Sequence, residues 1–219
     1  MNGHSPDLHY LVRQPDSTTT PAPVLILLHG VGSNERDLFS LASRIPANWL
    51  VVSARGPIPV GPNQFKWFEA MQTDGNYMID VESERQARQI VLRFIDAVVS
   101  QHNADRNAVV AAGFSQGAAL SLNLMMTEPE NLLASGVFSG RIMDEIKPQF
   151  TGRERLQGKQ VFLGFGTLDP YLPIKFAEKN RALLQTFGMK VTLSIDEIGH
   201  SVSQKEWDEF VVWLNHLSF

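Results

Sequence analysis

Short apolar runs recur along the chain and predict a series of buried strands. The most continuous run covers residues 24–28 (Val-Leu-Ile-Leu-Leu), which has no polar position and is therefore typical of a strand covered on both faces. We expect this strand to lie at the centre of a sheet. The other runs of similar character lie at 50–53, 109–114, 136–138, 161–165 and 191–195.

Helical patterns lie between these strands. The clearest covers residues 83–101, where apolar positions recur at spacings of three and four and leave charges on the opposite side. Ser83 and Gln86 suggest a capping box at its start. Strands that alternate with helices predict parallel βαβ units, hence a mostly parallel sheet with helices on both faces. The other helical patterns lie at 37–44, 116–126, 174–187 and 204–217.

Two polar segments fall outside this alternation. Residues 16–23 are rich in Ser, Thr and Pro, and we interpret them as a hairpin loop. Residues 55–80 carry three prolines and three glycines and predict a long irregular loop, which compact domains rarely keep without a use. We expect this loop to face the substrate. Residues 136–158 are too few for a large lid domain, so we expect a shallow, fairly open site.

Composition limits the class of protein more than its function. The 219 residues, 43% hydrophobic and 19% charged, fit a single domain spanning 1–219 and exclude a disordered chain. The formal net charge is -4 and the Lys and Arg residues are scattered, which argues against a nucleic-acid partner. No apolar stretch approaches the roughly 20 residues of a membrane-spanning helix, so stable membrane insertion is not expected. The absence of Cys excludes disulfides, thiolate zinc sites and a cysteine nucleophile.

The strongest chemical signal is residues 113–117, Gly-Phe-Ser-Gln-Gly, which match the pattern Gly-x-Ser-x-Gly. The pattern falls where a predicted strand ends and a predicted helix begins. A sharp turn there exposes the side chain of Ser115, while the two glycines avoid a clash between strand and helix. The alternative is a serine that only caps the helix, but such a cap would not need the second glycine.

A serine nucleophile needs a base, and the base needs an acid behind it. His200 follows the last predicted strand, and Asp169 follows the strand at 161–165. The carboxyl ends of parallel strands meet at one edge of a sheet, so we expect Ser115, Asp169 and His200 to converge there. Taken singly, an Asp-Pro pair is usually a turn and a loop histidine is usually solvated. The combination and its order along the chain therefore carry the prediction.

Acyl transfer also needs two hydrogen-bond donors for the negative charge on the former carbonyl oxygen. We assign one to the backbone N–H of Gln116, at the start of its helix, and the other to the backbone N–H of Val31, in the glycine-containing loop after the central strand. His29 in that loop is interpreted as a structural hydrogen-bonding residue. The histidines without a motif are interpreted as surface or capping residues: His4, His9, His102 and His216.

From about residue 24 to the end, the chain resembles the phospholipase/carboxylesterase family of small α/β-hydrolases, which includes acyl-protein thioesterases and bacterial carboxylesterases. Two positions depart from the family pattern, because Ser33 stands where an acidic residue is frequent and Glu69 replaces an Asp. These departures bear on substrate choice rather than on the chemistry. The matching blocks are 28–32 (Leu-His-Gly-Val-Gly), 66–69 (Lys-Trp-Phe-Glu), 113–117, 138–140 (Phe-Ser-Gly), 166–173 (Gly-Thr-Leu-Asp-Pro-Tyr-Leu-Pro) and 199–200 (Gly-His).

The resemblance implies an α/β-hydrolase fold with the roles given above and with no metal or organic cofactor. It also places Trp67 and Phe68 in the substrate pocket, and we add Leu172 to that pocket. For the two aromatic residues, core packing is nearly as good an interpretation, because aromatics fill cores routinely.

The expected activity is that of a cytoplasmic serine carboxylesterase acting on small-molecule esters with short to medium acyl chains. Two alternatives share the chemistry, an acyl-protein thioesterase and a lysophospholipase, because only the pocket decides between these acyl donors. A third, of another class, is a binding protein that keeps the fold without catalysis. A homodimer is left open.

Overall fold

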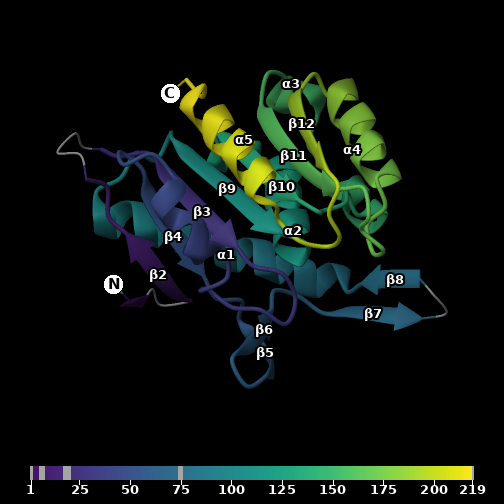
Figure 1. The fold of residues 1–219 in the computed structure, drawn as a ribbon, viewed down its shortest axis with the longest axis horizontal. Helices are drawn as coiled ribbons and strands as arrows, with labels where there is room; N and C mark the ends of the chain where they lie inside the picture. Colours follow the sequence, from purple (N-terminus) through teal and green to yellow (C-terminus); the bar gives the residue numbers. More distant parts are fainter. Residues whose placement is uncertain (1, 5–7, 17–20, 74–75, 219) are drawn as a thin grey trace.

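An eight-stranded sheet forms the centre of the molecule (Figure 1), seen in a computed structural model that describes residues 2–4, 8–16, 21–73 and 76–218. The strand order is β1-β2-β4-β3-β9-β10-β11-β12. Strands β1 and β2 run antiparallel to their neighbours, and the other six run parallel to one another. The strands are β1 (Asn2–His4), β2 (His9–Arg13), β3 (Val24–Leu28), β4 (Leu50–Ala54), β9 (Val109–Phe114), β10 (Ala134–Phe138), β11 (Gln160–Gly166) and β12 (Lys190–Asp196).

Strand β3 lies in the interior of the sheet, as its apolar run predicts. It pairs with β4 on one side and β9 on the other, and all five of its residues are buried. Because successive side chains point to opposite faces, Val24, Ile26 and Leu28 join one apolar cluster while Leu25 and Leu27 join another. The two clusters are the cores on either face of the sheet.

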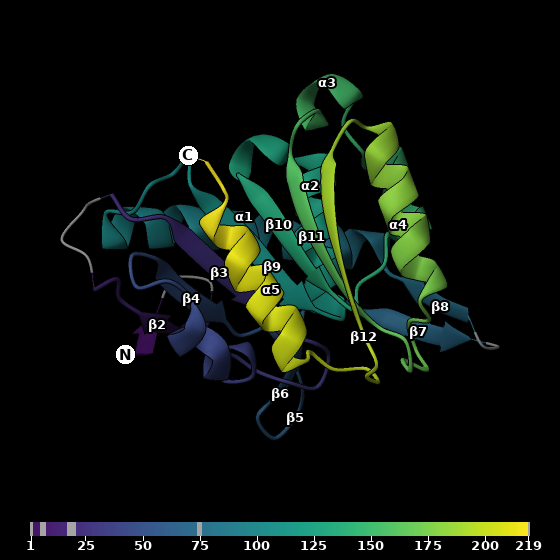
Figure 2. The same ribbon diagram turned by 45° about the horizontal axis from the view of Figure 1, so that its top comes forward.

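Helices cover both faces (Figures 1 and 2). One face packs against α1 (Val81–His102), α2 (Gln116–Thr127) and α4 (Lys175–Thr186). The other packs against α5 (Gln204–Asn215) and the 3-10 helix η1 (Leu38–Arg44). The remaining short helices are η2 (Pro129–Asn131), η3 (Asp144–Gln149) and α3 (Arg153–Leu156).

Two helix predictions need correction. The segment predicted as a helix at 37–44 forms a 3-10 helix, the tighter form typical of short pieces, and Pro46 follows soon after its end. Helix α1 begins at Val81, where the carboxylate of Asp80 accepts hydrogen bonds from the N–H groups of Glu82 and Ser83. The predicted capping box at Ser83 is therefore wrong, because Asp80 already supplies the cap.

The prediction of an irregular loop at 55–80 is also wrong, because two hairpins project from the sheet there (Figures 1 and 2). The first consists of β5 (Ile58–Gly61) and β6 (Gln64–Lys66), and the second of β7 (Ala70–Thr73) and β8 (Asn76–Ile79). The turn of the first contains Pro62 and Asn63, and Asn63 has a φ of 55°. Asparagine tolerates this left-handed conformation, so the turn was visible in the sequence.

The segment 16–23 does not close a hairpin. Strand β2 pairs with β4, and β4 lies between β2 and β3 in the sheet. The segment thus passes over one strand instead of joining two neighbours. Residues 17–20 of this prediction lie outside the described residues. Among the residues that are described, no helix has both the length and the apolar character needed to cross a membrane.

Candidate active site

Ser115 lies at the turn between β9 and α2 with φ 52° and ψ −113°, a backbone conformation that non-glycine residues rarely adopt. Its N–H donates to the carbonyl of Phe138 on the neighbouring strand (2.9 Å). The flanking glycines are required by space. A Cβ at Gly113 would lie 2.3 Å from the carbonyl carbon of Gly117, and a Cβ at Gly117 would lie 2.1 Å from the carbonyl oxygen of Leu28. The turn can therefore close only with glycine two residues before and two residues after Ser115.

Ser115, His200 and Asp169 form a hydrogen-bonded relay. His200 Nε2 lies 3.0 Å from Ser115 Oγ, and His200 Nδ1 lies 2.7 Å from Asp169 Oδ2. The three residues follow β9, β12 and β11, whose carboxyl ends meet at one edge of the sheet. This geometry allows the imidazole to take the hydroxyl proton while the carboxylate holds the imidazole in one tautomer.

Backbone hydrogen bonds join the two loops that carry Asp169 and His200. The N–H of Thr167 donates to the carbonyl of Asp196 (2.9 Å), and the N–H of Leu168 donates to the carbonyl of Ile198 (3.0 Å). The pairing of β11 with β12 thus continues beyond the strands. It fixes the distance between the acid and the base more tightly than two separate loops would.

The carboxylate of Asp169 is buried, with its residue only 4% exposed. Burial by itself would raise its pKa, but hydrogen bonds from His200 and from the N–H groups of Leu172 and Tyr171 outweigh burial and lower the pKa. Those two backbone donors lie 2.9 Å and 2.8 Å from Asp169 Oδ1. The acid is therefore held in its ionised form behind the imidazole.

Aromatic rings hold the imidazole of His200 on two sides. Its ring centroid lies 4.8 Å from that of Phe114 and 5.3 Å from that of Tyr171. Tyr171 is 75% exposed and Leu168 is 62% exposed. The rim beside the relay is consequently apolar and open to solvent.

Of the two expected oxyanion donors, Gln116 directly follows Ser115 in the chain, whereas Val31 comes from a distant loop. Gln116 is the first residue of α2, and Val31 follows β3 in the loop formed by residues 29–33. Within the described part of the chain, neither backbone N–H has a hydrogen-bond acceptor. A free N–H at the start of a helix favours an anion, because the helix dipole places partial positive charge there.

Residues 11–218 match the model of the phospholipase/carboxylesterase family. The chain belongs to this family. It is 31% identical to the esterase YpfH of Escherichia coli, over 96% of this chain and 88% of that protein. It is 26% identical to acyl-protein thioesterase 1 of Eremothecium gossypii, over 86% of this chain and 85% of that protein. The carboxylesterase of Bacillus cereus superposes with a TM-score of 0.83 at 26% identity, covering 96% of this chain and 95% of that one. The predicted α/β-hydrolase fold is confirmed.

In the block that resembles the family at 66–69, both aromatic side chains are buried. Trp67 is 1% exposed and Phe68 is 0% exposed, and both join the apolar cluster that also contains α2. Their burial supports core packing rather than the pocket role given to them from the sequence. Leu172 is half-buried, and its N–H is used by Asp169.

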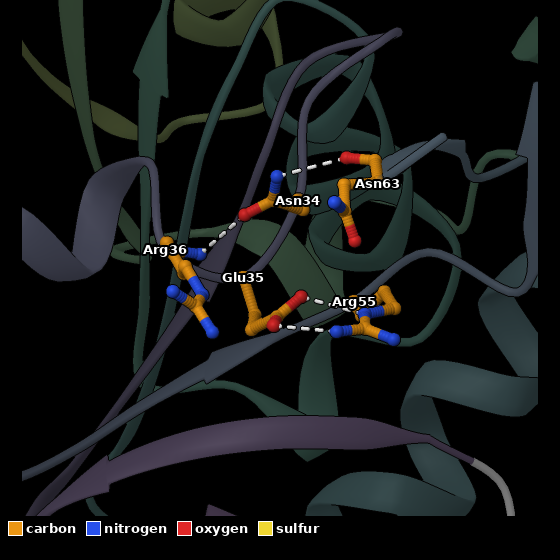
Figure 3. A pocket seen from close by; sticks show the side chains of 5 residues that line it. All are labelled: Asn34, Glu35, Arg36, Arg55 and Asn63. Atoms are coloured by element: carbon orange, nitrogen blue, oxygen red, sulfur yellow. Dashed lines mark hydrogen bonds and ion pairs between the residues drawn. The ribbon is translucent and has the colours of Figure 1, made fainter. Parts of the chain in front are cut away.

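A polar hollow of about 230 Å³ is lined by the chain that follows the loop after β3 and by Arg55 and Asn63 (Figure 3). Glu35 and Arg55 form a two-pronged ion pair across it, with distances of 2.6 Å and 2.7 Å. Asn34 donates to the carbonyl of Asn63 (2.9 Å), and this hydrogen bond joins the chain after residue 33 to the β5–β6 hairpin. Arg36 is its fifth lining residue, and no member of the relay lines it. We interpret the contacts that line the hollow as support for the loop after β3.

In the described part of the chain, His102 and His216 lie outside the relay. His102 ends α1 and lies within hydrogen-bond distance of Gln14 Nε2 (3.1 Å), and His216 Nδ1 lies 2.7 Å from the carbonyl of Val212 at the end of α5. Among the described residues, no group of three or more histidine, aspartate or glutamate side chains is arranged to hold a metal ion.

Proposed function

We propose that this protein is a serine carboxylesterase that hydrolyses small carboxylic esters with short to medium acyl chains. The observation that carries the proposal is the relay, in which Ser115 Oγ, His200 and Asp169 are joined at 3.0 Å and 2.7 Å. Distances within hydrogen-bond reach are what a nucleophile, its base and the orienting acid require. The family membership supports the same class of reaction.

The reaction proceeds through an acyl-enzyme. Ser115 Oγ attacks the ester carbonyl carbon while His200 Nε2 takes the hydroxyl proton, and the carbonyl oxygen becomes an oxyanion held by the N–H groups of Val31 and Gln116. Collapse breaks the bond to the alcohol, which leaves with the proton from His200. His200 then takes a proton from a water molecule that attacks the acyl group, and the carboxylic acid product leaves as Ser115 is regenerated.

The preference for short to medium chains rests on the absence of a large cover in the described structure. Between β10 and β11 the chain forms only the short helices η3 and α3, and the exposed Leu168 and Tyr171 flank Asp169. A small apolar rim of this kind suits a modest acyl chain. A long triacylglycerol would need a larger apolar surface to leave water.

An acyl-protein thioesterase activity is the second candidate, because relatives at 26% identity carry that name. The same relay accepts both acyl donors, so the relative kcat/KM on a matched ester and thioester decides between them. A thioester preference of more than about tenfold would favour the second candidate.

The test of the proposal is labelling by a fluorophosphonate probe together with turnover of p-nitrophenyl esters of increasing chain length. We expect Ser115→Ala to abolish labelling and to lower kcat by at least about 10⁴-fold. Ser139→Ala is the matched control. Ser139 also directly follows a strand of the sheet and also has a positive φ, but its hydroxyl is buried. Wild-type protein that neither labels nor hydrolyses any ester would point instead to a binding protein that keeps the fold.

A further inference from the structure

The side chain of Gln116 clamps the backbone of residues 67 and 68. Its Oε1 accepts from the N–H of Trp67 (2.8 Å), and its Nε2 donates to the carbonyl of Phe68 (2.9 Å). Gln116 is 4% exposed, so this amide is spent inside the protein rather than on a substrate. The first residue of α2 is thereby fixed to a segment that lies 48 residues earlier in the chain.

Trp67 extends this clamp to the loop after β3. Its indole Nε1 donates to the carbonyl of His29 (2.8 Å), and its ring lies 5.2 Å from the imidazole of His29. One buried tryptophan therefore contacts both segments that carry the oxyanion donors. Its backbone holds α2, and its indole holds the loop.

The imidazole of His29 is buried and has a defined tautomer. The N–H of Gly56 can only donate, so His29 Nε2, 2.9 Å away, must accept. The proton then lies on Nδ1, which donates to the carbonyl of Gly30 at 2.7 Å. Burial lowers the pKa of His29, which keeps the ring in the neutral form that satisfies both contacts.

The hydrogen bond to the Gly30 carbonyl determines where the N–H of Val31 points. Both groups belong to one planar trans peptide unit and are directed oppositely, so fixing one fixes the other. The Gly30 carbonyl accepts from His29 Nδ1 and also from the N–H of Ser33 (3.3 Å). The same reasoning applies at α2, where the carbonyl of Ser115 accepts from Ala119 N–H (3.0 Å) and so directs the N–H of Gln116.

We propose that His29 and Trp67 are positioning residues that set the orientation of the two oxyanion donors. The inference rests on the proposed esterase function. Neither residue touches the substrate, and each acts by holding backbone that carries an oxyanion donor. His29 holds the peptide plane that contains the Val31 N–H, and Trp67 keeps that plane in register with the start of α2.

The test compares His29→Leu and Trp67→Phe with wild type. The first variant removes the donor to Gly30, and the second removes the indole N–H but keeps most of the ring. We expect each to lower kcat about 10- to 100-fold while KM changes by less than about threefold, because the donors act mainly on the charge of the transition state. Affinity for an alkylboronic acid, which forms a tetrahedral adduct on Ser115, should fall by a factor similar to that for kcat.

Two further variants separate positioning from general destabilisation. His29→Asn places an amide N–H where Nδ1 lies and should recover most of the kcat that His29→Leu loses. Trp213→Phe alters another buried tryptophan, on α5 and the other face of the sheet, and should leave kcat unchanged. Circular dichroism melting gives the folded fraction by which each kcat is corrected.

Three results overturn the inference, and they are distinguishable. If wild type is active and Ser115→Ala is inactive, but His29→Leu and Trp67→Phe keep the wild-type kcat, only the positioning role is ruled out. So does a loss of kcat that leaves the boronic acid affinity unchanged. A wild-type protein without Ser115-dependent hydrolysis overturns the proposed function and this inference with it.

Discussion

At the scale of single residues, the site depends on a serine that is held in an unfavourable conformation. Positive φ at Ser115 is tolerated because the surroundings fix it: its N–H donates to the Phe138 carbonyl, and glycines at 113 and 117 leave room for the turn. A Cβ at Gly117 would press on the end of β3, which carries the loop with Val31. The same close approach that strains the nucleophile therefore brings the two donor segments together.

The role of Asp169 can be tested with an isosteric change. In Asp169→Asn, an amide N–H can face His200 Nδ1, so the hydrogen bond that fixes the imidazole tautomer is lost. We expect kcat to fall by about 10³- to 10⁴-fold, with fluorophosphonate labelling slowed to a similar extent. Glu197→Gln is the control, since this carboxylate lies in the same loop as His200 but outside the relay. Wild-type kcat in Asp169→Asn would contradict the role of Asp169.

The stability of Asp169→Asn relative to wild type should depend on pH. The pKa of Asp169 in the folded protein lies below its ordinary value of about 3.9, so the carboxylate stabilises the fold above that pH. This stabilisation disappears as the pH falls through the folded-state pKa. The melting temperature of Asp169→Asn should therefore lie below wild type at pH 7, and the difference should narrow below about pH 4.

At the scale of elements, α1 offers a test of its cap. Asp80→Ala leaves the N–H groups of Glu82 and Ser83 without their acceptor and should lower the free energy of unfolding by about 1 kcal/mol. Ser83→Ala should have a smaller effect, because the Ser83 hydroxyl accepts only the N–H of Glu69 outside the helix. Urea titration measures both. A larger loss of unfolding free energy in Ser83→Ala than in Asp80→Ala would instead support the capping box at Ser83.

The elements that could be predicted are those with a strong local signal. Buried parallel strands read as continuous apolar runs, and all six predicted runs lie within or overlap a strand. The hairpins at 55–80 were missed because their strands have only three or four residues, too short for a clear alternation. The pairing of β2 with β4 could not be read from the sequence, because register between distant strands is a property of the whole sheet.

The candidate site divides in the same way. Ser115, Asp169 and His200 follow predicted strands, so the rule that carboxyl ends share an edge was enough to bring them together. The buried clamp made by Gln116 and Trp67 was not predictable, since a glutamine after a nucleophile carries no sign of where its side chain points. Aromatic residues in a family block suggested a pocket, but their exposure depends on packing that no local pattern records.

At the scale of the whole molecule, a buried ionic network fixes the far end of α2. Glu84 is 0% exposed and accepts from Arg88 Nε (3.0 Å) and Asn123 Nδ2 (2.8 Å). Arg88 also donates to Thr127 Oγ1 (2.8 Å), in the last residue of α2, and to Gln149 in η3. The network therefore joins α1, α2 and η3 at the end of α2 opposite to Ser115.

Removing one partner of this network should be costly. In Arg88→Met the carboxylate of Glu84 stays buried without its cation, and we expect a loss of about 3–5 kcal/mol in the free energy of unfolding at neutral pH. The double variant Glu84→Gln/Arg88→Met should recover part of that loss, because the uncompensated charge is gone. Arg85→Met is the matched control on the same helix, since its pair with Glu82 is exposed and contributes little.

The pH dependence of Arg88→Met identifies the cause of its loss. Burial already raises the pKa of Glu84, and losing Arg88 raises it further, so the folded-state pKa lies above the unfolded value of about 4.3. Stability is then lost as the pH rises from the unfolded to the folded pKa, and the deficit should be larger at pH 8 than at pH 5. A deficit that does not change with pH would assign the loss to packing instead. The kcat of the folded fraction should stay at the wild-type value, because the Gln116 clamp at the other end of α2 holds the oxyanion donors independently.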